Sequence, residues 1–366
     1  MSIYLDPAQT ELAWMLDPDS TELALLAREA EARTPESPCD GRALARDADT
    51  LLALLRERHV GVATGVVDDS AAAAVIDAWS SRVESARTWG DAVTDLQFDL
   101  RAALGDEHVR LYGAPRWRDD RTEQEHDGPA VEERAVDGVL VITVRRLLGG
   151  PEDEALLAAW SAGADRHFAH DRIVLDLRGN PGGNDGHTYH WAKRRSRHVT
   201  DHAREANWTV RGKAFGYWNA AAWRAARDGI DAVPPHLIAG RHDPRPGDVL
   251  ELTEERWELP AGDVDWGGRL LVLVDRRTRS SGESSAWLLR DALGATLAGE
   301  PTTGMIEYGN IVPYALPAGG LAINLPTKHN DYGFPVESVG FPVDVPLDPD
   351  VPVEQIAAEF DAIVGR

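Results

Sequence analysis

The sequence contains few of the residues that mark several large classes of protein. Its 366 residues include one cysteine, Cys39, so an intramolecular disulfide cannot form and nothing requires an oxidising compartment. The lysines are only Lys193, Lys213 and Lys328, which leaves few candidates for a lysine base. No segment approaches the roughly 20 apolar residues of a membrane helix, and the N-terminus lacks the basic start and apolar run of a signal peptide. We therefore expect a cytoplasmic protein with no membrane partner.

Basic residues are also scarce relative to acidic ones. The chain has 38 Lys and Arg against 61 Asp and Glu, a formal net charge of −23. A nucleic-acid partner needs a basic surface to displace counterions, so we expect none. The composition, 43% hydrophobic and 27% charged, is that of a soluble globular protein, and the length suffices for two domains of about 100–200 residues. The sequence leaves open whether the protein forms a homo-oligomer.

The first part of the chain, residues 1–113, is predicted to be a helical N-terminal domain. Apolar residues recur with helical spacing around Leu51–Leu55 and again over residues 88–104. In the second segment they fall on one face, and Thr88 with Asp91 resembles a capping box. The charged, proline-containing residues 114–137 show no period and are interpreted as a connection.

Residues 138–366 show the alternation typical of an α/β domain. Short runs of apolar, β-branched residues at 139–144, 172–177 and 269–275 predict strands, and helical patterns at 152–168 and after residue 280 lie between or behind them. Strand, helix and strand in succession predict a parallel sheet. A Trp-rich stretch at about 196–266, interpreted as mostly helical, interrupts the pattern, and residues 353–364 predict a final amphipathic helix.

A glycine-rich turn, "LDLRGNPGG", follows the predicted strand at 172–177 and runs from Leu175 to Gly183. Because glycine has no side chain, the backbone N–H groups of such a turn can point at a developing oxyanion. An ordinary strand-to-helix turn explains the same residues. It is not a phosphate loop, since no Gly-Lys-Ser/Thr follows.

A second polar turn, "TRSSGESS", follows the predicted strand at 269–275. Ser280 and Glu283 fit a Ser-x-x-Glu capping box, which is a sufficient structural explanation. A serine between a strand and a helix is also well placed as a nucleophile, because the helix dipole and the next N–H favour an oxyanion there. The two interpretations are compatible.

Histidines supply the candidate bases and metal ligands. His108 follows the predicted helix at 88–104 and could take a proton from a serine, although a structural role is the commoner one for a single histidine. His187 and His190 are three residues apart, which is half of a zinc ligand set, and no supporting carboxylate–histidine pattern accompanies them. We therefore expect no metal and no cofactor.

Taken together, these stretches resemble the C-terminal processing, or tail-specific, serine peptidases, which include the tricorn core protease. "DLRGNPGG" is similar to that family's "DLRxNPGG", "TRSSGE" to its "TxSAxE" and "LGDEHVRL" to its "LxDxHT"; "GEPTTG" and "VESVGFPVD" follow in the family's order. The resemblance implies a ClpP/crotonase-like α/β core. It also implies that Ser280 is the nucleophile, His108 the base and Glu337 a functional acid, acting on a peptide or protein substrate.

The departures from the family pattern favour one branch of it. Met305 stands where many members carry a catalytic lysine, so the chain is more similar to the histidine-using, tricorn-like branch. Glu107 precedes His108 where that branch often has serine, and it could orient the base. No PDZ domain fits between His108 and the strand at 139–144. Substrate capture would then fall to the Trp-rich insertion, whose Trp208, Trp218 and Trp223 could form an apolar lid or simply pack.

The expected reaction is acyl transfer to water in a groove between the two domains. His108 would take the Ser280 proton, and the N–H groups of Gly182, Gly183 and Ser281 would hold the oxyanion. Two alternatives stay open at this stage. One is a non-catalytic module that binds a hydrophobic ligand or a peptide, and the other is a crotonase-like acyl-CoA enzyme, which would need a basic pocket for the CoA phosphates.

Overall fold

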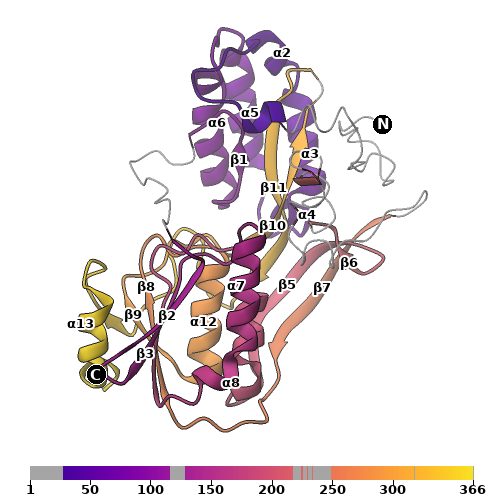
Figure 1. Ribbon diagram of the computed structural model, residues 1–366. Helices are drawn as coiled ribbons and strands as arrows, with labels where there is room; N and C mark the ends of the chain where they lie inside the picture. Colours follow the sequence, from indigo (N-terminus) through magenta and orange to yellow (C-terminus); the bar gives the residue numbers. More distant parts are fainter. Residues whose placement is uncertain are drawn as a thin grey trace. The chain divides into compact units, whose positions relative to one another are not determined.

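The computed structural model describes residues 28–115, 128–216, 224–225, 229, 233, 249–316 and 318–365. The chain divides into two compact units, each assembled from three segments (Figure 1). The first unit takes Met1–Thr122, Glu205–Glu255 and Tyr308–Asn330, and the second takes Glu123–Arg204, Arg256–Glu307 and Asp331–Arg366. None of the helices formed by the described residues is both long and apolar enough to cross a membrane.

The helices of the first unit come from the N-terminal region. They are α2 (Gly41–Ala45), α3 (Ala48–Arg58), α4 (Val60–Ala63), α5 (Ser70–Val83) and α6 (Trp89–Leu104). The predicted helix at 88–104 is confirmed: the Thr88 hydroxyl accepts the Asp91 N–H at 3.2 Å, and Gly105 ends the helix in the left-handed region at φ 57°. Its predicted apolar face, which includes Val93, Leu96 and Leu100, is fully buried.

A six-stranded sheet packs with these helices. Its strands are β1 (Arg110–Leu111), β5 (Thr200–Val210), β6 (Lys213–Ala214), β7 (Leu250–Leu259), β10 (Tyr308–Ala315) and β11 (Ala322–Asp331). Strand β11 lies between β1 and β5 and also pairs antiparallel with β10. Apolar side chains of β10 and β11, such as Val312 and Ile323, share one core with α3, α5 and α6.

The second unit is built on a largely parallel sheet in the order β12-β9-β8-β4-β3-β2. The strands are β2 (Val131–Val136), β3 (Val139–Val144), β4 (Arg172–Asp176), β8 (Arg269–Val274), β9 (Thr296–Gly299) and β12 (Val345–Pro346). Pairing is parallel from β3 through β12, and β2 is antiparallel to β3. The sheet predicted from the alternating pattern is thus confirmed, including its parallel pairing.

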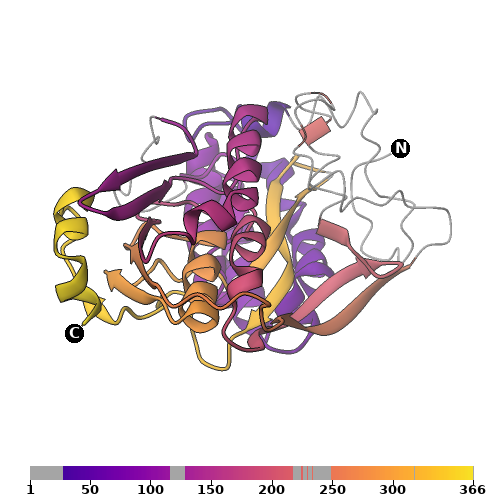
Figure 2. The ribbon, with the colours of Figure 1, turned by 60° about the horizontal axis from the view of Figure 1, so that its bottom comes forward.

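Helices cover both faces of this sheet, as Figure 2 shows for α12 and the yellow C-terminal helix. One face carries α7 (Pro151–Ala162), α8 (Ala164–His167), α9 (Gly186–Ala192), the 3₁₀ turn Lys193–Arg195 and α12 (Ser281–Leu293); the other carries α13 (Val353–Ala358) and α14 (Phe360–Val364). Successive residues of β8 alternate between the two cores: Leu270 and Val272 face α12, and Leu271 faces α13. The mixed α/β class with a helical N-terminal region is confirmed.

Some predicted elements are wrong. The described part of the stretch at 196–266 is mainly strand and not helix, because β5 and β7 are long strands. The run from Leu250 to Leu259 in β7 mixes apolar and charged residues with a two-residue period at its start. The supposed connection at 114–137 contains β2, which pairs with β3, while its residues 116–127 lie outside the described part. The single C-terminal helix is two short helices that meet at Glu359.

Candidate active site in the second unit

Two loops meet where the parallel strands β4 and β8 end. Leu177 donates its N–H to the carbonyl of Leu273, and the Thr278 hydroxyl donates to the carbonyl of Leu177 at 2.9 Å. The buried Asp275 carboxylate accepts the N–H groups of Gly179 at 2.8 Å and Thr278 at 2.9 Å. Since the carboxyl ends of neighbouring parallel strands lie at one edge of a sheet, the glycine turn and the serine turn are fixed side by side.

Ser280 has an unusual backbone conformation, with φ 53° and ψ −127°. A residue that carries a side chain rarely adopts this region, which costs of order 1–3 kcal/mol and recurs at functional sites. Here the conformation is held by two hydrogen bonds from the Ser280 N–H, to the carbonyl of Met305 at 3.0 Å and to the Glu283 carboxylate at 2.9 Å. The serine lies in a strained turn between β8 and α12, with its side chain half-buried at the N-terminus of that helix.

The glycine turn is in direct contact with Ser280. Gly182 has φ 92°, and a Cβ atom added to it would lie 2.8 Å from the Cβ of Ser280 and 2.9 Å from the Ser281 nitrogen. The fully buried Asn180 shapes the turn: its Nδ2 donates to the Val144 carbonyl, and its backbone carbonyl accepts the Arg279 N–H at 2.9 Å. Only glycine permits so close an approach at this backbone angle.

The predicted oxyanion donors differ in what they already bind. The Gly182 N–H donates to Oδ1 of Asn180 at 2.8 Å, so this group closes the turn in the structure, and its expected role as an oxyanion donor stays a prediction. Ser281 donates its hydroxyl to the carbonyl of Gly183 at 2.9 Å, which joins the two turns. Gly183 follows Gly182, which contacts Ser280, and Ser281 follows Ser280 itself; the role of their N–H groups as oxyanion donors stays a prediction.

Glu283 is a buried carboxylate that organises the serine turn. Besides the Ser280 N–H, it accepts the Thr302 hydroxyl at 2.6 Å and the N–H groups of Gly304 at 2.8 Å and Met305 at 2.9 Å. Burial raises the pKa of Glu283 to about 7, and these donors act in the opposite direction. The capping box expected from the Ser-x-x-Glu pattern is present, and in it the Glu283 carboxylate accepts the Ser280 N–H at 2.9 Å.

Glu337 holds the adjoining part of the same loop. Its Oε2 accepts the N–H groups of Ile306 and Glu307, both at 2.9 Å. Together Glu283 and Glu337 therefore receive four consecutive backbone N–H groups, from residue 304 to residue 307. Glu337 thus has an observed structural contact, and its predicted action on the base stays a prediction.

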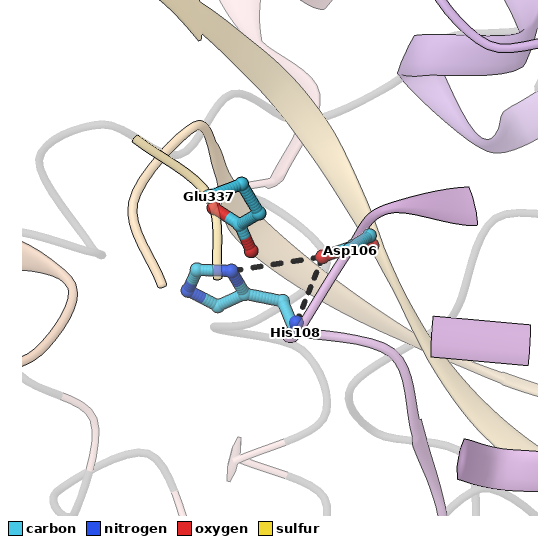
Figure 3. A group of neighbouring side chains, drawn as sticks. All are labelled: Asp106, His108 and Glu337. Atoms are coloured by element: carbon cyan, nitrogen blue, oxygen red, sulfur yellow. Dashed lines mark hydrogen bonds and ion pairs between the residues drawn. The ribbon is translucent and has the colours of Figure 1, made fainter. Parts of the chain in front are cut away.

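His108 lies in the first unit, just after α6. Its N–H donates to Oδ1 of Asp106 at 2.8 Å, and its Nδ1 is 3.7 Å from the same oxygen (Figure 3). The carboxylate of Glu107 instead lies 3.8 Å from the guanidinium of Arg101. Asp106 is therefore the neighbouring acid that faces the imidazole, and sequence reasoning did not assign it a role. Asp106 is the aspartate of the "LGDEHVRL" stretch that resembles the family's "LxDxHT", and this match could have pointed to it.

The remaining candidates have local partners. His187 contacts the Glu154 carboxylate at 3.6 Å, and burial lowers its pKa; His190 lies 3.3 Å from the Lys193 ammonium. Trp208 donates its indole N–H to the carbonyl of Arg58 at 3.0 Å and packs against the core of the first unit. Trp218 and Trp223, also considered for an apolar lid, lie outside the described residues.

The fold is shared with proteins of known structure. A protein described only as a candidate peptidase, from Parabacteroides merdae, is similar with a TM-score of 0.52 at 16% identity, covering 88% of this chain and 94% of that one. A lipoprotein from Streptococcus agalactiae is similar with a TM-score of 0.50 at 12% identity, covering 89% and 97%. No curated protein matches the sequence. At these identities the likeness concerns the fold.

Residues 166–332 match the family model of peptidase family S41. The matched segment includes both the glycine turn and the serine turn, and it ends just before Glu337. The match bears out the expected enzyme class, a serine-type peptidase of the hydrolases. The narrower expectations, a histidine base and action near C-termini, stay predictions.

Gly182→Ala tests the contact between the two turns. The added methyl group meets the backbone of Arg279 and Ser281 within 2.9 Å at a φ that disfavours alanine, so we expect a loss of about 2–4 kcal/mol in the free energy of unfolding. Urea denaturation measures it. Gly267→Ala is the matched control, because a Cβ there meets no atom within 4 Å. Equal stability of the two variants would contradict the contact.

Glu283→Gln tests the burial of the carboxylate through the pH dependence of stability. The pKa of Glu283 is about 7 in the folded chain and near 4.5 without the fold, so the native state binds the extra proton between these values. Its contribution therefore falls as pH rises from about 4.5 to 7, by at most about 3 kcal/mol. We expect the free energy of unfolding of Glu283→Gln to fall less over this range than that of the wild type. If the pH curves of the wild type and Glu283→Gln are parallel between pH 4.5 and 7, Glu283 is ionised in the folded protein over that range and its pKa is not raised.

Proposed function

We propose that the protein hydrolyses peptide bonds with Ser280 as the nucleophile. The observation that carries this proposal is the strained backbone of Ser280 at a strand-to-helix turn, with Gly182 packed against it. A capping serine needs no such conformation, since N-cap residues normally have extended φ and ψ values. A nucleophile benefits from it, because a sharp turn exposes the hydroxyl and brings the following N–H alongside.

The proposed reaction is acyl transfer to water with His108 as the base. His108 removes the proton from the Ser280 hydroxyl, whose oxygen attacks the substrate carbonyl and forms a tetrahedral oxyanion. The imidazolium then gives that proton to the leaving amine. Water attacks the acyl-enzyme with His108 again as base, which frees the new carboxylate and restores Ser280.

The oxyanion in this proposal is held by the N–H groups of Ser281 and Gly183. The Ser281 N–H is in the first turn of α12, where the positive end of the helix dipole adds to the attraction. Gly182 shapes the turn, since its own N–H is donated to Asn180. Removing one oxyanion donor typically costs about 3–4 kcal/mol in the transition state.

Glu337 and the loop from residue 304 to residue 307 complete the proposed site. A carboxylate that fixes the loop contacting Ser280 is also suited to align the base, as the family resemblance implies for Glu337. Met305 has no basic group, so a serine–lysine pair cannot form at this position. This supports a mechanism that uses serine, histidine and glutamate.

Labelling with a fluorophosphonate probe tests the nucleophile and the base. We expect the wild type to be labelled, Ser280→Ala to lose labelling completely and His108→Ala to be labelled at least about 100-fold more slowly, because the hydroxyl then lacks a general base. Mass spectrometry of the labelled peptide locates the adduct.

Ser284→Ala serves as the control, since its hydroxyl is on the same helix and donates to Asp185. Labelling that persists in Ser280→Ala would contradict the proposal. An unlabelled wild type that binds a hydrophobic ligand saturably would favour the binding module, and CoA-dependent turnover by Ser280→Ala would favour the acyl-CoA enzyme.

Action near substrate C-termini is the narrower part of the proposal and rests on the resemblance to tail-specific peptidases. We expect a peptide with a free C-terminal carboxylate to be cleaved at least about tenfold faster, in kcat/KM, than the same peptide with a C-terminal amide, because one lost charge-assisted contact is worth about 1.4 kcal/mol or more. Mass spectrometry of the products gives both rates and cleavage positions. Equal rates with internal cleavage would indicate an endopeptidase without tail specificity.

A further inference from the structure

A carboxylate lies between two imidazoles in the first unit. Asp106 is 1% exposed, and its two oxygens face different histidines. Oδ1 accepts the His108 N–H at 2.8 Å and is 3.7 Å from the His108 Nδ1, as Figure 3 shows, while Oδ2 is 3.1 Å from the Nε2 of His59. A buried charge is costly unless it is paired, so this arrangement requires donors on both sides of Asp106.

The hydrogen bonds of His59 fix its tautomer. His59 is the N-cap of α4, and its Nδ1 accepts the Val62 N–H at 3.4 Å. A neutral imidazole that accepts at Nδ1 carries its proton on Nε2, which is the nitrogen facing Asp106. The ring is fully buried and packs against Tyr308, with ring centroids 5.2 Å apart, so it has little freedom to turn away. His59 is therefore held as a donor to the carboxylate.

The backbone on either side of Asp106 is also fixed. Gly105 ends α6 in the left-handed conformation, and the Asp106 N–H donates to the Arg101 carbonyl at 3.1 Å. Within the first unit, the charged and titratable groups near the carboxylate include His59, His108 and Arg101, and the Nε of Arg101 donates to the Val109 carbonyl at 2.7 Å. Glu107 lies 3.8 Å from the other end of that guanidinium. Of the two neighbouring acids in the first unit, Asp106 and not Glu107 is thus placed to act on the Nδ1 side of His108.

We propose that Asp106 is a positioning residue for His108. In this proposal His59 fixes the position of the Asp106 carboxylate through its other oxygen, Oδ2. The inference rests on the proposed function, in which His108 is the base. A carboxylate facing Nδ1 favours the tautomer with the proton on that nitrogen, which puts the ring's basic lone pair on Nε2, the nitrogen that takes the serine proton in the proposed reaction. The separation of 3.7 Å is longer than a hydrogen bond and shortens as His108 becomes positive, as is common for catalytic contacts without substrate.

The competing explanation is that Asp106 only closes a turn. Its acceptance of the N–H two residues later is an ordinary Asx-turn, which needs a side-chain oxygen and no charge. Asparagine would supply that oxygen equally well. The two explanations therefore differ in what removal of the charge does to the imidazole of His108.

Asp106→Asn separates the two explanations, because it keeps the shape and the turn acceptor. We expect fluorophosphonate labelling of Ser280 to slow by about 10²–10⁴-fold, and peptide hydrolysis to lose kcat by the same factor with KM nearly unchanged. The acidic limb of the labelling-rate profile should also move to lower pH, because the imidazolium has lost its counter-charge. Glu107→Gln is the matched control, and we expect both its rate and its profile to remain those of the wild type.

His59 provides a second test if Asp106→Asn proves unstable. His59→Gln can still donate an amide hydrogen toward Asp106, whereas His59→Leu cannot. We expect His59→Gln to stay within about tenfold of the wild-type labelling rate and His59→Leu to fall well below it. Near-UV circular dichroism and thermal unfolding show whether each variant is folded. Equal labelling rates of the two His59 variants would remove His59 from the proposal.

An NMR titration of the histidine ring protons gives a readout that does not need activity. We expect the midpoint for His108 to move to lower pH in Asp106→Asn, and to stay in place in Glu107→Gln. An unchanged midpoint together with an unchanged labelling rate in folded Asp106→Asn would overturn the inference. A wild type that is not labelled at Ser280 would instead contradict the proposed function, and the titration would still decide whether Asp106 acts on His108.

Discussion

The parallel pairing of β4 with β8 is the constraint on which the candidate site depends. It brings together two turns that are about 100 residues apart in the sequence, and one hydrogen bond from Thr278 to the carbonyl of Leu177 ties them where the strands end. Gly182 can then lie against Ser280, and the strained serine is held from the other side by Met305 and Glu283. If one of these strands shifted its register by one residue, each of its side chains would move to the opposite face of the sheet and the turns would no longer meet.

Carboxylates that accept backbone N–H groups recur throughout the structure. Asp275 holds the two turns, Glu283 and Glu337 hold the loop from residue 304 to residue 307, and Asp47 accepts the N–H groups of Ala318 and Gly319. Irregular loops have N–H groups that no strand or helix satisfies, and a charged acceptor binds them more strongly than a neutral one. Part of the large acidic excess therefore serves to fix loops, besides covering the surface.

The elements that the sequence predicts well are those with a clear period. The spacing of Val93, Leu96 and Leu100 places α6 correctly, and the strands β3, β4 and β8 follow from short apolar runs between helical patterns. The strands β5 and β7 could not be predicted in this way, because the burial of their side chains depends on pairing with distant segments. The glycine and serine turns could be found because they resemble two motifs of one family in the family's order, although each turn alone also fits an ordinary structural role.

The contacts of individual side chains were harder to predict. Asp106 could not be distinguished from Glu107 as the acid beside His108, because the choice depends on His59, which is 47 residues earlier, and on the direction of each side chain. The use of the Gly182 N–H by Asn180 likewise depends on the detailed shape of a five-residue turn. A sequence pattern identifies which residue types are present, and the fold decides which atoms meet.

The division of the first unit among three distant segments affects the order in which the chain can mature during synthesis. The N-terminal helices, with His59 between α3 and α4 and His108 after α6, are made first, but Tyr308 and the strands β10 and β11, which complete their core, leave the ribosome some 200 residues later. Until then the apolar faces of α3, α5 and α6 lack their partners and are candidates for chaperone binding. The strands β10 and β11 therefore set the moment at which the first unit, which contains His59 and His108, can complete its core.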